Sequence, residues 1–190
     1  SGRCGEALDR LKAFLDRYAG HDNGTLARFA LGRCAAKAGE EALALEHLGR
    51  VARDEEDRAG VRSRAALLQA ALLLRKGKLR EAEKALGVAV LSADPEIAVE
   101  ALFSRADLLA RRKDPRAGAE FLKLTYRYPD RRMWAARALG RAGELYESAG
   151  RRATAIRIFQ KMRKVAPPGA LRTKAEATLR RLGKAPGPRR

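Results

Sequence analysis

The chain has 190 residues, of which 46% are hydrophobic, and a formal net charge of +18. The apolar content argues against disorder, and the length allows one domain or a short array of repeats with a sizeable core. Two cysteines and two histidines form no CxxC, HxxxH or Cys/His cluster. We therefore expect no metal site and no cofactor, and the cysteine count excludes a disulfide framework.

Neither a membrane span nor a signal peptide is visible in the sequence. The longest apolar run, AALLQAALLL at 65–74, falls short of the roughly 20 residues that a spanning helix needs. The chain opens on Ser1 and Gly2 followed directly by an amphipathic segment. This opening suggests a chain trimmed at its start, so the lack of a signal peptide leaves the compartment unknown.

Every predicted element is a helix, because Ala, Leu, Arg, Glu and Lys dominate and strand-like alternation is missing. Gly39, Gly77, Gly150 and the Asp114-Pro115 pair recur at intervals of 36 to 38 residues. A second set of turn signals falls between them. The pattern predicts ten helices, over residues 3–19, 24–38, 40–53, 59–76, 78–92, 95–112, 115–128, 131–149, 151–166 and 169–182.

The recurring turns pair these helices into hairpins. We expect a half repeat at 3–19, hairpins at 24–53, 59–92, 95–128 and 131–166, a capping helix at 169–182 and a basic disordered tail at 183–190. One hairpin cannot bury its own apolar faces, whereas a stack of hairpins builds a continuous core. The predicted fold is therefore all-α, a right-handed superhelix (α-α solenoid) that occupies residues 1–182 as one domain.

The unpaired first helix suggests a self-association surface. Leu8, Leu11 and Leu15 share one face of it. We expect this face to be exposed, which favours a homodimer through the N-terminal half repeat.

The repeated positions resemble those of tetratricopeptide (TPR) repeats. In the last full hairpin the matching residues are Gly143, Tyr146, Gly150, Ala155, Phe159 and Pro167. The earlier hairpins match at fewer positions, namely Leu31, Gly32, Gly39 and Ala44, then Gly77, Ala82 and Leu86, then Ala117, Phe121 and Pro129. The resemblance implies a non-catalytic scaffold that binds a protein or peptide partner and forms part of a larger bacterial protein. The residue pattern of the repeats is similar to that of bacterial envelope TPR proteins of outer-membrane assembly and the Tol–Pal system. This similarity favours a periplasmic over a cytoplasmic location.

The family register also implies a partner-binding groove lined by the first helix of each hairpin. The residues expected there are Phe29, Arg33, Lys37, Arg64, Leu67, Ala71, Arg137, Arg141 and Glu144. Arg137 and Arg141 suit an acidic partner, because the planar guanidinium donates two parallel hydrogen bonds to a carboxylate. The alternative is that these arginines pair with acids of the chain itself.

Positive charge is concentrated in the C-terminal third. Residues 131–190 carry 17 Lys and Arg against three acids. A predicted anion patch consists of Arg151, Arg152, Arg157, Lys161 and Lys164. It supports an alternative function, in which residues 131–190 bind nucleic acid or another polyanion. The other interpretation is a solvated helix face, and aromatic residues for base stacking are not interleaved in this stretch.

Three further features have structural explanations as well as functional ones. Trp134, the single tryptophan, suits a partner anchor or packing between repeats. His21, Asp22 and Thr25 suit a helix–helix turn better than a catalytic group, and we expect no enzyme activity. Cys4 and Cys34 suit either two buried thiols or one bridge between adjacent helices.

Overall fold

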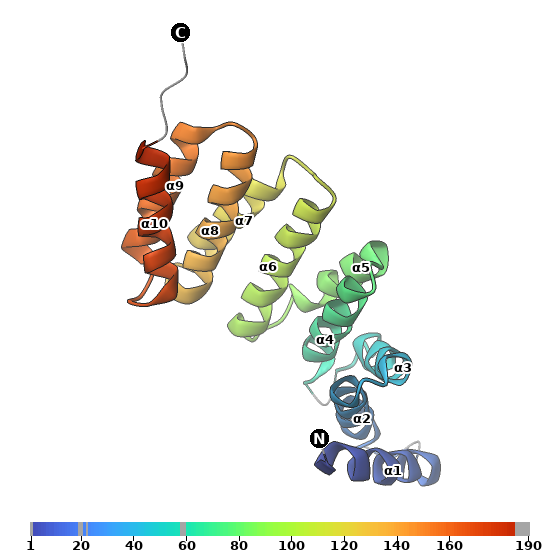
Figure 1. Ribbon diagram of the computed structural model, residues 1–190. Helices are drawn as coiled ribbons and strands as arrows, with labels where there is room; N and C mark the ends of the chain where they lie inside the picture. The colour runs from blue at the N-terminus through green and yellow to red at the C-terminus, as the bar shows by residue number, and fades with distance from the viewer. Residues whose placement is uncertain (1, 19–20, 22, 58–59, 185–190) are drawn as a thin grey trace. The chain divides into compact units, whose positions relative to one another are not determined.

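The computed structural model describes residues 2–18, 21, 23–57 and 60–184. This part of the chain is helical and contains no strand. Each helix begins and ends within three residues of the range predicted for it, so the helix assignment is confirmed. The helices are α1 (Gly2–Arg17), α2 (Gly24–Ala38), α3 (Glu41–Ala52), α4 (Arg62–Arg75), α5 (Leu79–Ala89), α6 (Pro95–Arg111), α7 (Ala117–Arg127), α8 (Arg132–Ser148), α9 (Arg152–Val165) and α10 (Ala170–Lys184) (Figure 1).

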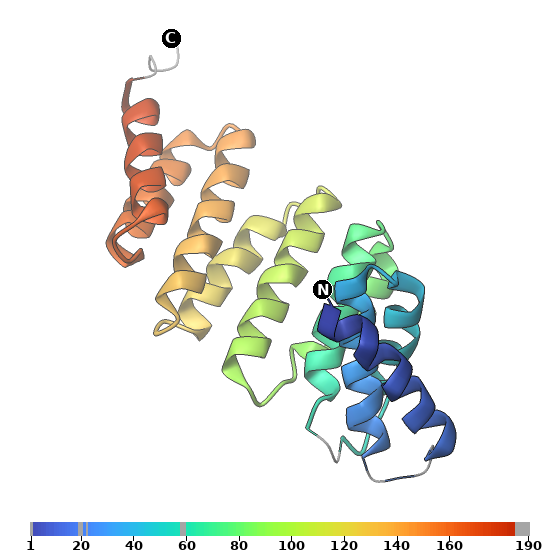
Figure 2. The same ribbon diagram turned by 60° about the horizontal axis from the view of Figure 1, so that its bottom comes forward.

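The chain divides within α6 into two compact units, Ser1–Ala101 and Leu102–Arg190. In the first unit the consecutive pairs from α1–α2 to α4–α5 pack against each other. In the second unit α7, α8, α9 and α10 do the same (Figure 2). Phe103 of α6 contacts Phe121 of α7 with ring centroids 5.1 Å apart. The all-α, repeat-like architecture is thus confirmed, whereas one solenoid over residues 1–182 stays a prediction.

Four turns between paired helices share one hydrogen-bonding pattern. The left-handed residue of each turn is Gly39, Gly77, Lys113 or Gly150, with φ of 86°, 70°, 56° and 74°. In each turn the next N–H group donates to a carbonyl five residues earlier, which closes the end of the preceding helix. The donor and acceptor pairs, all 2.9 Å apart, are Glu40–Ala35, Lys78–Leu73, Asp114–Leu109 and Arg151–Tyr146.

Two helix starts depend on aspartate side chains. The Asp57 carboxylate accepts hydrogen bonds from the N–H groups of Val61 and Arg62, each 2.9 Å long. It therefore caps the first turn of α4, which begins three residues later than predicted. The Asp114 carboxylate accepts a 2.9 Å bond from the Arg116 N–H group, and α7 begins beyond this turn.

A small residue and a large one recur at matched places in every hairpin. The first helix contributes Gly32, Ala70, Ala106 and Gly143, and the second contributes Leu48, Leu86, Phe121 and Phe159. All are buried. A Cβ built on Gly143 would lie 2.7 Å from two ring carbons of Phe159, and one on Gly32 would lie 2.8 Å from Leu48 Cγ. In these two hairpins the glycine therefore leaves room for the large side chain of its partner helix.

The expectation of an exposed leucine face on α1 is wrong. Leu8 and Leu15 are buried in the core of the first unit, and Leu11 packs partly buried against that core. Their cover is the chain itself, since α1 packs against α2. Homodimerisation through α1 stays a prediction, but the three leucines that suggested it are not available as the contact surface. The predicted tail at 183–190 lies mostly outside the described residues, and its first two residues belong to α10.

The two cysteines face each other across α1 and α2. Both are free thiols and half-buried. A hydrogen bond with Cys4, together with burial, raises the pKa of the Cys34 thiol. Cys4 and Cys34 are thus neighbouring free thiols in this structure.

Candidate protein-interaction surface

An arginine lies against two aromatic rings on the second unit. The Arg137 guanidinium of α8 lies 4.3 Å from the Trp134 ring centroid and 4.9 Å from that of Phe103. The two rings are themselves 5.5 Å apart. Both aromatic residues are half-buried and Arg137 is exposed. Trp134 therefore packs between neighbouring hairpins and also supports a charged group at the surface.

A chain of ion pairs runs beside this cluster and links α6, α8 and α10. Asp107 accepts hydrogen bonds from Arg111 Nε at 3.0 Å and from Arg141 Nη2 at 2.7 Å. Arg141 Nη1 also donates to Glu144 at 3.0 Å, and Glu144 accepts from Lys174 Nζ at 2.6 Å. Every charged side chain in this series of ion pairs therefore contacts a side chain of opposite charge.

The ion pairs hold their carboxylates in the charged form. Burial raises the pKa of the Asp107 carboxyl, but hydrogen bonds from Arg141 and Arg111 outweigh burial and lower it. Burial likewise raises the pKa of Glu144, and hydrogen bonds from Lys174 and Arg141 lower it by more. The same contacts outweigh desolvation at Arg141 and raise its pKa.

The two arginines expected to hold an acidic partner therefore differ. Arg141 already donates to two carboxylates of its own chain, which is the alternative that the sequence left open. Arg137 pairs with no carboxylate among the described residues, and its guanidinium is positioned by aromatic rings. Phe103, Trp134 and Arg137 together are called the Arg137 cluster below, and Arg137 is the member of it that the sequence predicted for the groove.

The groove residues of the first unit lie in mixed surroundings. Phe29 is only 7% exposed and belongs to the core. The Arg33 guanidinium lies 5.7 Å from the Phe29 ring centroid, and Lys37 is exposed. Arg64 contacts Asp94 at 3.4 Å, and Leu67 is half-buried.

The predicted anion patch divides into two parts. Arg151 lies 5.9 Å from the Tyr146 ring centroid, and Arg152 donates to the carbonyl of Leu182. These two arginines stabilise contacts at the start of α9. Further along the helix lie Arg157, Lys161 and Lys164, and Lys161 Nζ lies 4.2 Å from the ring centroid of Tyr126 on α7.

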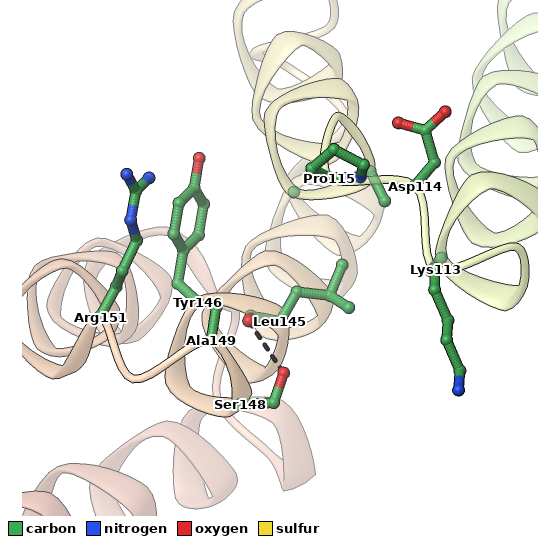
Figure 3. A pocket seen from close by; sticks show the side chains of 11 residues that line it. Lys113, Asp114, Pro115, Leu145, Tyr146, Ser148, Ala149 and Arg151 are labelled. Atoms are coloured by element: carbon green, nitrogen blue, oxygen red, sulfur yellow. Dashed lines mark hydrogen bonds between the residues drawn. The ribbon is translucent and has the colours of Figure 1, made fainter.

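A pocket of about 440 Å³ opens between two of the turns of the second unit (Figure 3). Small apolar residues and Leu145 line it, with Lys113, Asp114, Tyr146 and Arg151 among its polar residues. The Tyr146 ring and the Arg151 side chain run alongside each other, whereas Lys113 points to the opposite side. The Ser148 hydroxyl donates to the Leu145 carbonyl at 2.9 Å, which commits it to the helix backbone rather than to a base.

The His21 segment has the contacts of a turn. Its Nδ1 accepts a 3.1 Å bond from the Asn23 N–H group. Thr25 Oγ1 donates to Asp54 at 3.3 Å, and Asp22 lies outside the described residues. Over the described ranges, no group of three His, Cys, Asp or Glu side chains could bind a metal ion. None of the helices described is both long and apolar enough for a membrane span.

No protein-family model matches the chain, and no curated protein matches its sequence. The TPR resemblance therefore depends on the repeat positions alone. The helical pairing and the matched small and large residues agree with that resemblance at the level of architecture. Assignment to the family stays a prediction.

Two contacts of this surface were missed in the sequence, and repeat spacing is the signal that could have found them. Arg141 pairs with Asp107, which precedes it by 34 residues, and Lys174 pairs with Glu144 across 30 residues. Such separations equal about one repeat and bring equivalent helices of consecutive hairpins together. Glu147 and Arg181 follow the same rule, with contacts of 2.6 and 2.9 Å across 34 residues.

Proposed function

We propose that this chain is a non-catalytic, TPR-like scaffold module that binds a protein or peptide partner through the Arg137 cluster. The observation that supports the proposal is a Trp and an Arg stacked together at the surface. These two residue types, with Tyr, are the ones that most often dominate the energy of protein interfaces. An acidic or C-terminal carboxylate of the partner would pair with Arg137, and an adjacent apolar residue would contact Trp134.

Preorganisation favours Arg137 over the other groove cations. Its guanidinium is held by two rings, so less side-chain entropy is lost when a carboxylate binds. Arg141 and Lys174 are less suited, because a partner would have to displace Glu144 or Asp107 from them first. The ion-pair chain instead fixes α6, α8 and α10 in place around the cluster.

The test uses the single tryptophan as its reporter. Peptides selected from a random display library on the whole chain are titrated while Trp134 emission is recorded. A peptide with an acidic group beside an apolar residue should shift the emission, and Arg137→Gln should weaken its binding about tenfold, equal to about 1.4 kcal/mol. Arg137→Lys should recover only part of the loss, because lysine lacks the planar fork.

Arg80→Gln is the matched control, since Arg80 is an exposed arginine on α5. It should leave both affinity and emission unchanged. Binding should also persist when salt rises from roughly 0.1 to 0.5 M, because the apolar contacts are not screened. Selected peptides that bind without changing Trp134 emission, or that bind Arg137→Gln equally well, would contradict the proposal.

A further inference from the structure

Tyr126 is an exposed aromatic side chain on α7. It is 73% exposed, although Lys161 of α9 lies over one side of its ring at 4.2 Å. The rest of the ring therefore faces solvent. The sequence of α9 has no aromatic residue placed among its exposed cations. Because this contact joins α7 to α9, Tyr126 supplies an aromatic ring beside those cations.

The helix α9 is strongly basic. Its sequence RATAIRIFQKMRKV has no acidic residue. Arg157, Lys161 and Lys164 recur at i, i+4 and i+7, so they share one side of the helix. Arg157 and Lys164 are exposed and make no ion pair among the described residues. This arrangement is the opposite of the ion pairs that link α6, α8 and α10, where Arg111, Arg141 and Lys174 each have a carboxylate.

Local structural roles account for only part of this charge. Lys164 lies in the last turn of α9, where a cation interacts favourably with the helix dipole. Arg157 lies in the middle of the helix and gains nothing from the dipole. Three cations on one helix side repel one another, and an anionic ligand would relieve that repulsion.

We propose that Tyr126, Arg157, Lys161 and Lys164, together the α7–α9 basic face, bind single-stranded nucleic acid. The cations would contact successive phosphates, and an unpaired base would stack on the open side of the Tyr126 ring. Stacking on an aromatic residue within a basic surface is how sequence-tolerant single-strand binding proteins hold their ligands. A duplex offers no unpaired base to this ring, so single strands should bind more tightly.

Lipid and protein partners fit this face less well. Of the large hydrophobic side chains that are exposed in the described part of the chain, only Tyr126 belongs to α7 or α9. The face therefore has no apolar wedge to insert into a bilayer. An acidic protein would match the charge, but it would leave the tyrosine ring without a planar partner.

The first experiment measures fluorescence anisotropy of a labelled single-stranded 20-mer of deoxythymidine with the whole chain. Tyr126→Ala should weaken binding by about 5- to 100-fold, the range expected for one lost base stack. Tyr126→Phe should bind like the original protein, because it keeps the ring. The control is Tyr18→Ala, which removes another exposed tyrosine that also lies beside an arginine, and it should have no effect.

The second experiment varies salt. Three phosphate contacts predict a slope of about −2 for the logarithm of affinity against the logarithm of salt concentration. Arg157→Gln combined with Lys164→Gln should reduce that slope to about −0.7. Arg80→Gln combined with Lys84→Gln removes two exposed cations from α5 and should leave the slope unchanged.

Four outcomes would overturn the proposal. They are no measurable binding of the 20-mer, equal binding by Tyr126→Ala, equal or tighter binding of heparin, and binding of anionic phosphatidylserine vesicles but not of the 20-mer. The inference is independent of the proposed scaffold function, because the two surfaces share no residue. Arg137→Gln should bind the oligonucleotide normally, so failure of one proposal leaves the other intact.

Discussion

At the scale of single residues, Gly143 shows how tightly the hairpins are packed. Gly143→Ala would place a methyl group 2.7 Å from two ring carbons of Phe159. The helix propensity gain of about 1 kcal/mol is smaller than the cost of overpacking a core, about 1 to 3 kcal/mol. We expect a net loss of stability of up to about 2 kcal/mol, measured by urea denaturation.

The same substitution at Gly87 provides the control. Gly87 lies within α5, and a Cβ built there meets nothing within 4 Å. Gly87→Ala should therefore stabilise the protein by about 0.5 to 1 kcal/mol. Equal effects at the two glycines would show that helix propensity, and not contact with Phe159, determines the result.

The ion-pair chain makes a second residue-scale prediction. Arg141→Met should raise the pKa of both Asp107 and Glu144, because each carboxylate loses a hydrogen bond to the guanidinium. NMR titration of the side-chain carboxyl carbons measures this directly. The stability cost should stay below about 1 kcal/mol, since the pairs are partly solvated.

Arg116→Gln separates this local effect from a general change in charge. It should raise the pKa of Asp114, which Arg116 now holds at about 2 through side-chain and backbone hydrogen bonds. It should leave the pKa of Asp107 unchanged. If both substitutions raised every carboxyl pKa alike, the loss of net charge would be the cause.

At the scale of elements, the turn after α6 differs from the other three. Lys113 adopts φ of 56° at a place where the other turns have glycine. A residue with a side chain costs about 1 kcal/mol in this left-handed region. Lys113→Gly should therefore raise the stability by up to about 1 kcal/mol, measured as a higher thermal midpoint. Gly77→Ala is the reverse test and should lower it.

The elements were the part of the fold that sequence reasoning predicted best. Glycine positions and apolar spacing are local signals, so all ten helices could be located. The start of α4 was misplaced because its cap is the Asp57 side chain, which acts from four residues away. The burial of Leu8 and Leu15 was missed because it depends on how closely α1 packs against α2.

The candidate site was predicted less completely, for the same physical reason. The sequence selected Arg137 and Arg141 together, but only tertiary contacts distinguish an arginine on aromatic rings from one that is already paired. Tyr126 was missed because its partner Lys161 lies 35 residues further along the chain. Contacts between equivalent helices become visible only when the repeat is laid out in space.

At the scale of the whole molecule, acid should be more damaging than base. The pKa values of Glu41 and Glu147 are lowered by hydrogen bonds from Lys76 and Arg181, and Asp114 is held at about 2. A carboxylate with a lowered folded-state pKa stabilises the protein above its unfolded pKa, and that stability is lost as pH falls through the folded value. The unfolding midpoint should thus drop between about pH 5 and pH 2.

Net charge adds to this effect. Protonation of the 23 carboxylates leaves 41 Lys and Arg side chains without compensation. Their repulsion favours the expanded chain, and added salt should restore part of the midpoint at pH 3 by screening it. Stability that stays level from pH 7 to pH 2 would show that these ion pairs contribute nothing to folding.

The pairing of Gly143 with Phe159 and of Gly32 with Leu48 has a consequence for how this chain can change over time. In both hairpins the glycine leaves the space that the large side chain fills. The packing therefore constrains the combined volume of the two side chains and not each residue separately. Either residue can drift if its partner compensates, and the helices stay where they are. The quantity that each hairpin must keep is therefore the combined side-chain volume at the two positions. Hairpins of the same geometry can diverge in sequence as long as that combined volume is kept.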